Sequence, residues 1–208
     1  MSASNARRVF IFLIALLIAG PTNAIELNPY DAIVVVGDSL SNGGPHRVWP
    51  DILKQHTEGT LYNLAAPGRT AEMWAAHRKD FGIYFLDDPY VREYAIIWLG
   101  TNDLIAGRAP RDTVSLILFL ATNLRAAGAD RVAIVLGPEP FIPLHSLIHE
   151  LNEIQEWACT VEAFDVDCID LRGITGVGKE LFEADGLHLS QRGHRRVMRR
   201  VRDFLEGW

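Results

Sequence analysis

Residues 32–42 read AIVVVGDSLSN, five apolar residues followed at once by a glycine and a group of small polar residues. The apolar run is short, continuous and rich in β-branched side chains, which is typical of a strand buried on both faces of a parallel sheet. Gly37, Asp38 and Ser39 all favour a turn. This stretch therefore predicts a central strand whose carboxyl end carries polar side chains.

Four more short apolar runs resemble the first, and segments with helical spacing of apolar residues separate them. The expected strands are residues 32–36, 61–64, 94–99, 131–136 and 166–171, and the expected helices are residues 46–56, 70–79, 111–127, 144–160 and 190–204. Gly128 suits the end of the third helix, and Ser190 suits the start of the last. This alternation predicts an α/β fold, with one doubly wound five-stranded parallel sheet in the flavodoxin-like order 2-1-3-4-5.

The first 24 residues differ from the rest of the chain. Arg7 and Arg8 precede the uninterrupted apolar run VFIFLIALLIAG at residues 9–20, and PTNA follows at residues 21–24. That order predicts a secretory signal peptide, residues 1–24, with cleavage after Ala24 and a single secreted or periplasmic domain of residues 25–208. An uncleaved N-terminal anchor is the alternative, because signal and anchor differ mainly in the length of the apolar run.

The expected domain is acidic. Two of the 20 basic residues and none of the 26 acidic residues precede it, so 18 basic and 26 acidic residues remain, a net charge of −8. General binding of nucleic acid needs positive patches and is not expected. The one basic stretch, residues 192–202 (RGHRRVMRRVR), has Val197, Met198 and Val201 at helical spacing. We interpret it as a solvated helix face, with contact to anionic lipid or polysaccharide as the alternative.

A polar or glycine-containing cluster follows each expected strand. The clusters are residues 37–42, 63–68, 100–103, 137–140 and 185–188, the last after a short connection. In an open parallel sheet the carboxyl ends of the strands meet at one edge, and ligands bind there. The sequence therefore predicts that all five clusters converge on one site.

Three side chains in these clusters suit acyl transfer. Asp185 precedes His188 by three residues, so its carboxylate can accept the Nδ1 proton of the imidazole. Nε2 then acts as a base, and a serine hydroxyl such as that of Ser39 becomes a nucleophile once a base is within reach. The backbone N–H groups of Ser39 and Gly68 and the side-chain amide of Asn102 are the expected donors to an oxyanion.

In this order, the clusters resemble the conserved blocks of the GDSL/SGNH hydrolase family along nearly the whole of residues 25–208. GDSL starts at Gly37, GTND at Gly100 and DGLH at Asp185. The resemblance implies a flavodoxin-like three-layer α/β/α sandwich, the SGNH hydrolase fold. It also implies roles for the residues named above. These are Ser39 as nucleophile, His188 as base, Asp185 as orienting acid, and Ser39, Gly68 and Asn102 as the oxyanion hole.

The family includes lipases, lysophospholipases, thioesterases, arylesterases and carbohydrate acetylesterases, so the resemblance implies a carboxylic ester hydrolase without naming its substrate. A lipid or thioester substrate and an O-acetylated glycan are both open. Five apolar residues expected near the site either line an acyl groove or belong to the core: Trp49, Met73, Trp74, Phe141 and Ile142. Acyl transfer by the same triad and a non-catalytic binding module are further alternatives. A monomer is expected, meeting a membrane only through the signal segment or a lipid substrate.

Other chemistries lack their motifs. No G-x-S-x-G, G-x-G-x-x-G or Walker sequence occurs, which argues against an α/β-hydrolase nucleophile elbow and a nucleotide cofactor. His145 and His149 lie four residues apart and Glu150 follows, but H-E-x-x-H is absent and no third ligand is evident, so neither a metal nor another cofactor is expected. Cys159 and Cys168 can form a disulfide after export, and the sequence leaves that bridge open.

Overall fold

The computed structural model describes residues 31–85, 91–140, 142–175 and 179–207. The expected signal peptide, its cleavage site and the first residues of the expected domain lie outside the described residues. Within the described part of the chain, every helix is too short or too polar to cross a membrane.

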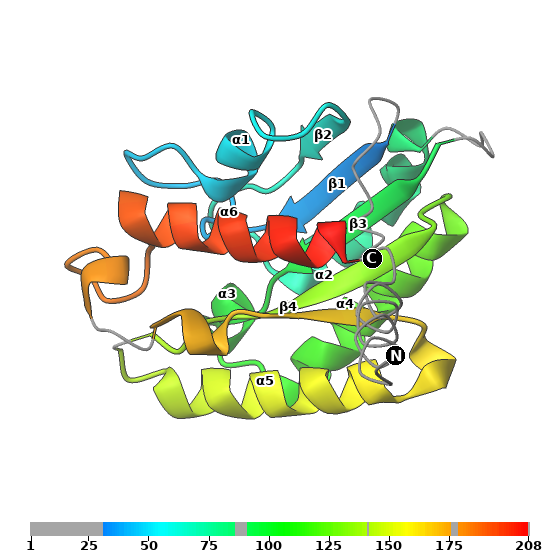
Figure 1. The fold of residues 1–208 in the computed structure, drawn as a ribbon. Coiled ribbons are helices and arrows are strands. Elements are labelled where there is room, and N and C mark those ends of the chain that lie inside the picture. Colours follow the sequence, from blue (N-terminus) through cyan, green and yellow to red (C-terminus); the bar gives the residue numbers. More distant parts are fainter. Residues whose placement is uncertain (1–30, 86–90, 141, 176–178, 208) are drawn as a thin grey trace, which may run out of the picture.

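One five-stranded sheet forms the middle of the protein (Figure 1). Its strands are β1 (Ala32–Gly37), β2 (Thr60–Asn63), β3 (Glu93–Trp98), β4 (Arg131–Leu136) and β5 (Asp167–Asp170). The spatial order is β2-β1-β3-β4-β5, and every neighbouring pair is parallel. The expected α/β class and the 2-1-3-4-5 order are therefore confirmed.

Helices cover both faces of the sheet, which makes three layers. They are α1 (Trp49–Leu53), α2 (Ala71–Ala76), α3 (Thr101–Ile105), α4 (Pro110–Ala126), α5 (His145–Thr160) and α6 (Gln191–Glu206). Short 3₁₀ helices span Arg78–Tyr84, Glu162–Phe164, Arg172–Thr175 and Lys179–Leu181. Helices α1 and α6 pack on one face, where α6 crosses in front of the sheet in Figure 1, and α2 and α4 pack on the other.

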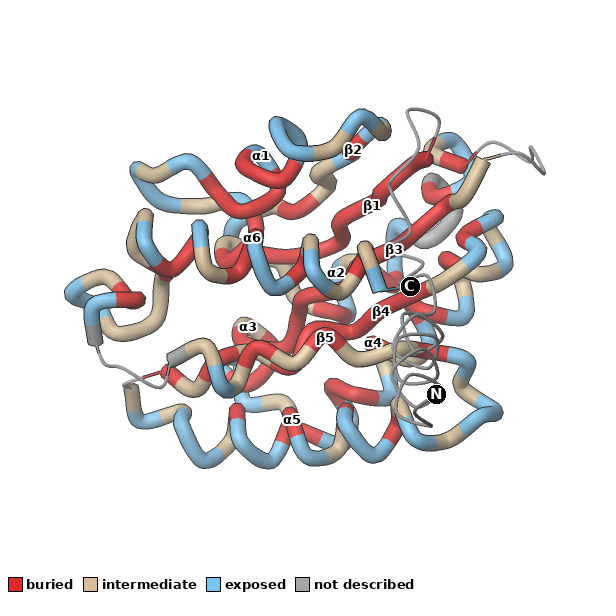
Figure 2. Tube along the Cα trace, viewed as in Figure 1, coloured by how far each residue is buried: buried red, intermediate tan, exposed pale blue. Residues whose placement is uncertain are grey.

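Alternate residues of β1 face the two helical layers, and this alternation explains why the whole strand is apolar. Ile33 and Val35 pack with α1 and α6, whereas Val34 and Val36 pack with α2 and α4. All four side chains have no exposed surface, and Figure 2 shows the strand buried along its length. Burial of a Val or Ile side chain stabilises the fold by about 1.5–3 kcal/mol, so β1 anchors both halves of the core.

The basic stretch forms the amphipathic helix α6. Val197, Met198 and Val201 are buried on its inner face, and Arg192 and Arg199 are exposed. The expected amphipathic helix over residues 192–202 is confirmed, and the alternative of contact with anionic lipid or polysaccharide stays a prediction. The helix begins at the expected N-cap: the hydroxyl oxygen of Ser190 accepts a hydrogen bond of 3.2 Å from the Gly193 N–H. This cap places the start of α6 directly after the 185–188 cluster.

Two local expectations differ from the structure. The helix expected over residues 46–56 is only the five-residue α1, which has Pro50 in its first turn, where proline is well tolerated; His46 lies in the loop before it. Helix α3 was not expected, since five residues are too few to display helical periodicity. It starts after Gly100, whose φ of +121° is accessible to glycine.

A disulfide joins the end of α5 to β5. The Cα atoms of Cys159 and Cys168 are 5.9 Å apart and their sulfur atoms are bonded, which resolves the alternative that the sequence left open. The bridge closes a short loop at the edge of the sheet, beside the last strand.

Candidate active site

The polar clusters gather at the carboxyl edge of the sheet, as expected for a doubly wound fold. The Ser39 loop follows β1, the Gly68 loop follows β2, and Asn102 lies in α3 directly after β3. The segment that carries Asp185 and His188 precedes α6 and lies at the end toward which the β1 arrow points in Figure 1. Segments distant in the chain thus share one edge.

Ser39, His188 and Asp185 form a continuous chain of contacts. The Ser39 Oγ atom is 2.9 Å from His188 Nε2, and His188 Nδ1 is 2.7 Å from Asp185 Oδ2. With the imidazole proton on Nδ1, the ring donates to the carboxylate and accepts from the hydroxyl. About a third of the His188 side chain is exposed, so the hydroxyl–imidazole pair is accessible to a substrate.

The turn that holds Asp185 also fixes its carboxylate. Oδ1 accepts hydrogen bonds of 2.9 Å from the backbone N–H groups of Leu187 and His188. Partial burial alone would raise the pKa of Asp185, but the hydrogen bonds from the His188 ring and from these two N–H groups outweigh it and hold the pKa below its ordinary value. The carboxylate is therefore ionised at neutral pH, as an orienting partner for an imidazole must be.

A second loop braces this turn. His46 Nε2 lies 2.6 Å from a carboxylate oxygen of Glu183. The backbone N–H of Arg47 donates to the Gln191 side chain, whose amide donates back to the Arg47 carbonyl at 3.2 Å. The pairs bring residues about 140 positions apart together, and no local sequence pattern identifies them. They connect the loop after the Ser39 turn to the segment that carries His188.

The three expected oxyanion donors come from three different loops. The backbone N–H groups of Ser39 and Gly68 donate to no group within the described chain. Gly68 has a φ of +75°, which glycine adopts without strain. The Asn102 side-chain amide donates to the Arg69 carbonyl at 3.0 Å and to Asp38 Oδ2 at 3.3 Å. Both of its N–H groups are thus engaged in the free protein.

The sequence profile of the GDSL-like lipase/acylhydrolase family matches residues 35–196, a span that contains Ser39, Gly68, Asn102, Asp185 and His188. This chain belongs to that family. As a GDSL-family hydrolase, it carries the GDSL motif at the turn after its first strand. No sequence among curated proteins matches the chain significantly.

Solved structures of other proteins share the fold of this GDSL-family hydrolase. A lipolytic G-D-S-L protein from Veillonella parvula has a TM-score of 0.70 and 20% identity, with 82% of this chain and 95% of that chain covered. The esterase EstA from Pseudoalteromonas sp., inhibited by monoethylphosphonate, has a TM-score of 0.64 and 18% identity, with 86% and 98% covered. An acetyl xylan esterase from Geobacillus stearothermophilus has a TM-score of 0.69 and 11% identity, with 87% and 97% covered. At these identities the likeness establishes the SGNH hydrolase fold.

Two buried aspartates of this GDSL hydrolase hold its loops. Asp38 accepts a hydrogen bond of 2.9 Å from the Leu40 N–H, and burial raises the pKa of its carboxyl to about 7. Asp103 accepts one of 2.9 Å from the Ala71 N–H, and burial raises its pKa as well. Both side chains are almost completely buried. Neither contacts Ser39 or His188 by a hydrogen bond, so they shape the loops around the site.

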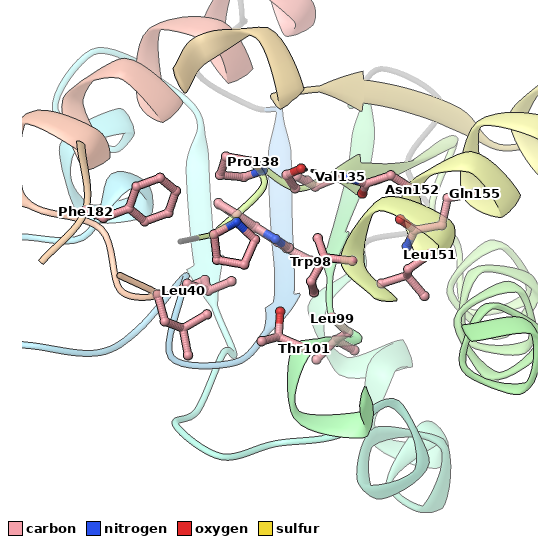
Figure 3. Close-up of a pocket in the computed structure, with 14 residues that line it drawn as sticks. Leu40, Trp98, Leu99, Thr101, Val135, Pro138, Leu151, Asn152, Gln155 and Phe182 are labelled. Atoms are coloured by element: carbon pink, nitrogen blue, oxygen red, sulfur yellow. Dashed lines mark hydrogen bonds between the residues drawn. The ribbon is translucent and has the colours of Figure 1, made fainter. Parts of the chain in front are cut away.

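A largely apolar pocket lies beside the Ser39 turn of this GDSL hydrolase (Figure 3). Its lining includes Leu40, Trp98, Val135, Pro138, Leu151 and Phe182. Of the five apolar residues expected near the site, the four in the described part of the chain, Trp49, Met73, Trp74 and Ile142, are not in this lining. Trp49 is completely buried in the core, Met73 is about half exposed, and the Trp74 indole donates to the Gly37 carbonyl. Phe141 lies outside the described residues. The sequence did not predict this pocket, because its residues come from five separate segments of the chain.

His145 and His149 meet Glu139. His145 Nε2 is 2.8 Å from one carboxylate oxygen, and His149 Nδ1 is 2.7 Å from the other. The hydrogen bond from His149, together with the nearby His145, lowers the pKa of Glu139. Glu150, the neighbour considered from the sequence, is exposed and is not part of the cluster. Over the described residues, no set of three His, Cys, Asp or Glu side chains has the arrangement of a metal site.

Proposed function

We propose that this GDSL-family hydrolase is an exported serine esterase that cleaves carboxylic esters through an acyl-enzyme on Ser39. The contact that carries the proposal is the 2.9 Å distance from Ser39 Oγ to His188 Nε2. On the other side of the imidazole ring, His188 Nδ1 is 2.7 Å from Asp185 Oδ2. Nucleophilic catalysis at an acyl carbon requires a hydroxyl in contact with a base and a carboxylate that orients the base.

The reaction starts with proton transfer from Ser39 to His188 as the serine oxygen attacks the ester carbonyl carbon. The tetrahedral intermediate collapses, the alcohol leaves with the proton that His188 returns, and the acyl group stays on Ser39. Water then repeats the attack with His188 as base, and the carboxylic acid leaves. Asp185 keeps the proton on Nδ1 and stabilises the imidazolium in both halves.

The negative oxygen of each intermediate needs donors, and the chain offers three. The N–H groups of Ser39 and Gly68 donate to no group in the described part of the chain, so both are available to the oxyanion. Asn102 donates its 3.3 Å hydrogen bond to Asp38, and we propose that this longer contact gives way to the oxyanion while the bond to Arg69 holds the amide in place. Each such donor lowers the barrier by about 3–4 kcal/mol in a site from which water is excluded.

The second candidate is a carbohydrate O-acetylesterase with the same triad. The fold match to an acetyl xylan esterase motivates it, and so does a pocket that α5 closes at one side. Transfer to an acceptor other than water uses the same acyl-enzyme. A series of 4-nitrophenyl esters separates the candidates, since a maximum of kcat/KM at acetate favours the glycan and a maximum at longer chains favours a lipid or thioester.

A fluorophosphonate probe tests the proposal, because it labels a serine only when that serine is activated. We expect wild type to be labelled and Ser39→Ala to be inert. Ser115→Ala removes an exposed hydroxyl on α4 and serves as the control that retains labelling. Absence of labelling in folded wild type would support the non-catalytic binding module instead.

Export and assembly are tested separately. The apolar run before residue 24 supports a secreted or periplasmic enzyme. Mass spectrometry of the protein from its native host should find an N-terminus at residue 25, and a start at residue 1 would favour the anchor. Size-exclusion chromatography should give a monomer, since the proposed machinery lies within one chain.

A further inference from the structure

The pocket beside Ser39 contains a glutamine without a hydrogen-bonding partner. Gln155, on α5, is 1% exposed, and neither its Oε1 nor its Nε2 forms a hydrogen bond within the described chain. Leaving buried amide groups unpaired costs about 1–3 kcal/mol for each group, so such groups are rare. Asn152, one turn earlier on the same helix, donates to the Gly137 carbonyl at 2.9 Å. Of these two buried amides on α5, only that of Gln155 is unpaired within the described chain.

A second polar group lies in the same lining. Trp98 is 3% exposed, and its indole N–H is engaged in no hydrogen bond among the described residues. A Cβ atom at Gly137 would lie 3.2 Å from the indole nitrogen, so a larger residue at this position would crowd the N–H. Figure 3 shows the Trp98 ring between Leu40 on one side and Gln155 on the other.

The pocket lies against the catalytic segments. Three of its lining residues, Leu40, Thr101 and Leu187, directly adjoin Ser39, Asn102 and His188 in the chain. An acyl group attached to Ser39 therefore has this pocket within reach. The remaining lining is mostly apolar, and α5 closes it on one side. The enclosed space is about 20 Å³, so an acyl group can enter only if it is short and the lining side chains move apart.

We infer that this pocket binds the acyl part of the substrate and that Gln155, aided by Trp98, recognises a hydroxyl group on a short acyl chain. The inference rests on the proposed esterase function and narrows its substrate to hydroxyacyl esters. A hydroxyl is the smallest group that both donates and accepts, so it can donate to Gln155 Oε1 and accept from Gln155 Nε2 or Trp98 Nε1. A carboxylate would only accept, and among the described residues the lining contains no Lys or Arg to offset its charge.

Two esters of nearly equal size measure how much a hydroxyl on the acyl chain contributes to kcat/KM. They are 4-nitrophenyl 3-hydroxybutyrate and 4-nitrophenyl 3-methylbutyrate, which differ by a hydroxyl in place of a methyl group. Wild type should prefer the hydroxy ester in kcat/KM by about tenfold or more, because the methyl group leaves the buried amide unpaired. The preference should be largest for one enantiomer.

Gln155→Leu should abolish or reverse that preference while keeping the enzyme active on the methyl ester. It should also keep or raise Tm, since the change removes an unpaired amide at nearly constant volume. Glu150→Leu, at an exposed position on the same helix, is the matched control and should keep the wild-type ratio.

Failure of hydroxyl recognition by Gln155 and failure of the proposed esterase function give different results. Equal kcat/KM for the two esters in wild type, or a preference that survives Gln155→Leu, would overturn the inference even if fluorophosphonate labels Ser39. An equal loss on both esters together with a lower Tm would make Gln155 a structural residue and overturn it too. Failure of wild type to be labelled or to cleave any ester would refute the esterase itself.

Discussion

Asn102 and Asp38 are joined by a hydrogen bond of 3.3 Å from the side-chain amide to a carboxylate oxygen, across 64 positions of the chain. The bond links α3, at the end of β3, to the turn that follows β1. It also couples an expected oxyanion donor to a buried carboxyl whose pKa is raised to about 7. Each partner leads to a separate prediction.

Asn102→Ala should lower kcat by about 10²–10³ with little change in KM, because an oxyanion contact exists only in the transition state. Steady-state kinetics on one 4-nitrophenyl ester measure both constants. Asn123→Ala, which removes an exposed amide on α4, should leave both unchanged. If Asn102→Ala altered KM alone, Asn102 would be a ground-state binding residue.

Asp38→Asn should change how stability depends on pH. Burial raises the pKa of Asp38 from 3.8 to about 7, so the folded state favours the protonated carboxyl. The stability that this provides is fully present below pH 3.8 and is lost as the pH rises through 7. The free energy of unfolding of Asp38→Asn minus that of wild type should therefore rise between pH 4 and pH 8. The rise should be on the order of a few kcal/mol.

Urea unfolding at a series of pH values measures this difference. Asp51→Asn removes an exposed carboxylate on α1 and should track wild type across the range. A difference between Asp38→Asn and wild type that does not vary with pH would mean that Asp38 has an ordinary pKa in the folded protein.

His194 should contribute the opposite dependence. It is 2% exposed, and burial lowers its pKa from 6.5 to about 4. Its folded-state pKa lies below the unfolded value, so its contribution is present above pH 6.5 and is lost as the pH falls through 4. Urea unfolding measures this dependence. Between pH 6.5 and pH 4, the free energy of unfolding of His194→Gln should fall less than that of wild type, even if the variant is less stable at every pH. Parallel curves over that window would contradict the assignment of a neutral, buried imidazole.

Removing the disulfide should destabilise the protein without removing activity. The bridge joins residues nine positions apart, and closing so short a loop stabilises the fold by about 2–3 kcal/mol in the chain-entropy account. Dithiothreitol should lower the Tm of wild type toward that of the double variant Cys159→Ala, Cys168→Ala, which itself should not respond. A reductant-insensitive wild type would show that the bridge adds no stability.

Long, regular elements were predictable from the sequence, and short ones were not. Residues 32–36 and 94–99 are apolar on both faces, and α4 and α6 span several turns, so their periodicity is visible locally. Helix α3 has five residues, and the 3₁₀ helices depend on turns rather than on periodicity. The expected helix over residues 46–56 failed because the loop at His46 is held by Glu183, a contact with no local signal.

Some residues of the candidate site were likewise predictable from the sequence, and others were not. Ser39, Asp185 and His188 could be named from short motifs because each motif follows a strand and the strands of a parallel sheet end at one edge. The brace from His46 to Glu183, the engaged amide of Asn102 and the pocket at Gln155 could not be named. Each depends on side chains from separate segments whose distances are set by packing.

The sequence by itself determined the parallel sheet, its strand order and the edge where polar residues collect, because apolar periodicity and glycine-rich turns act over a few neighbouring residues. Only the tertiary structure decided that Ser39 Oγ lies 2.9 Å from His188 Nε2 and that the buried side chain of Gln155 has no hydrogen-bonding partner among the described residues. Such distances result from the packing of helices on both faces of the sheet, which positions residues 149 apart in the chain to within a hydrogen-bond length.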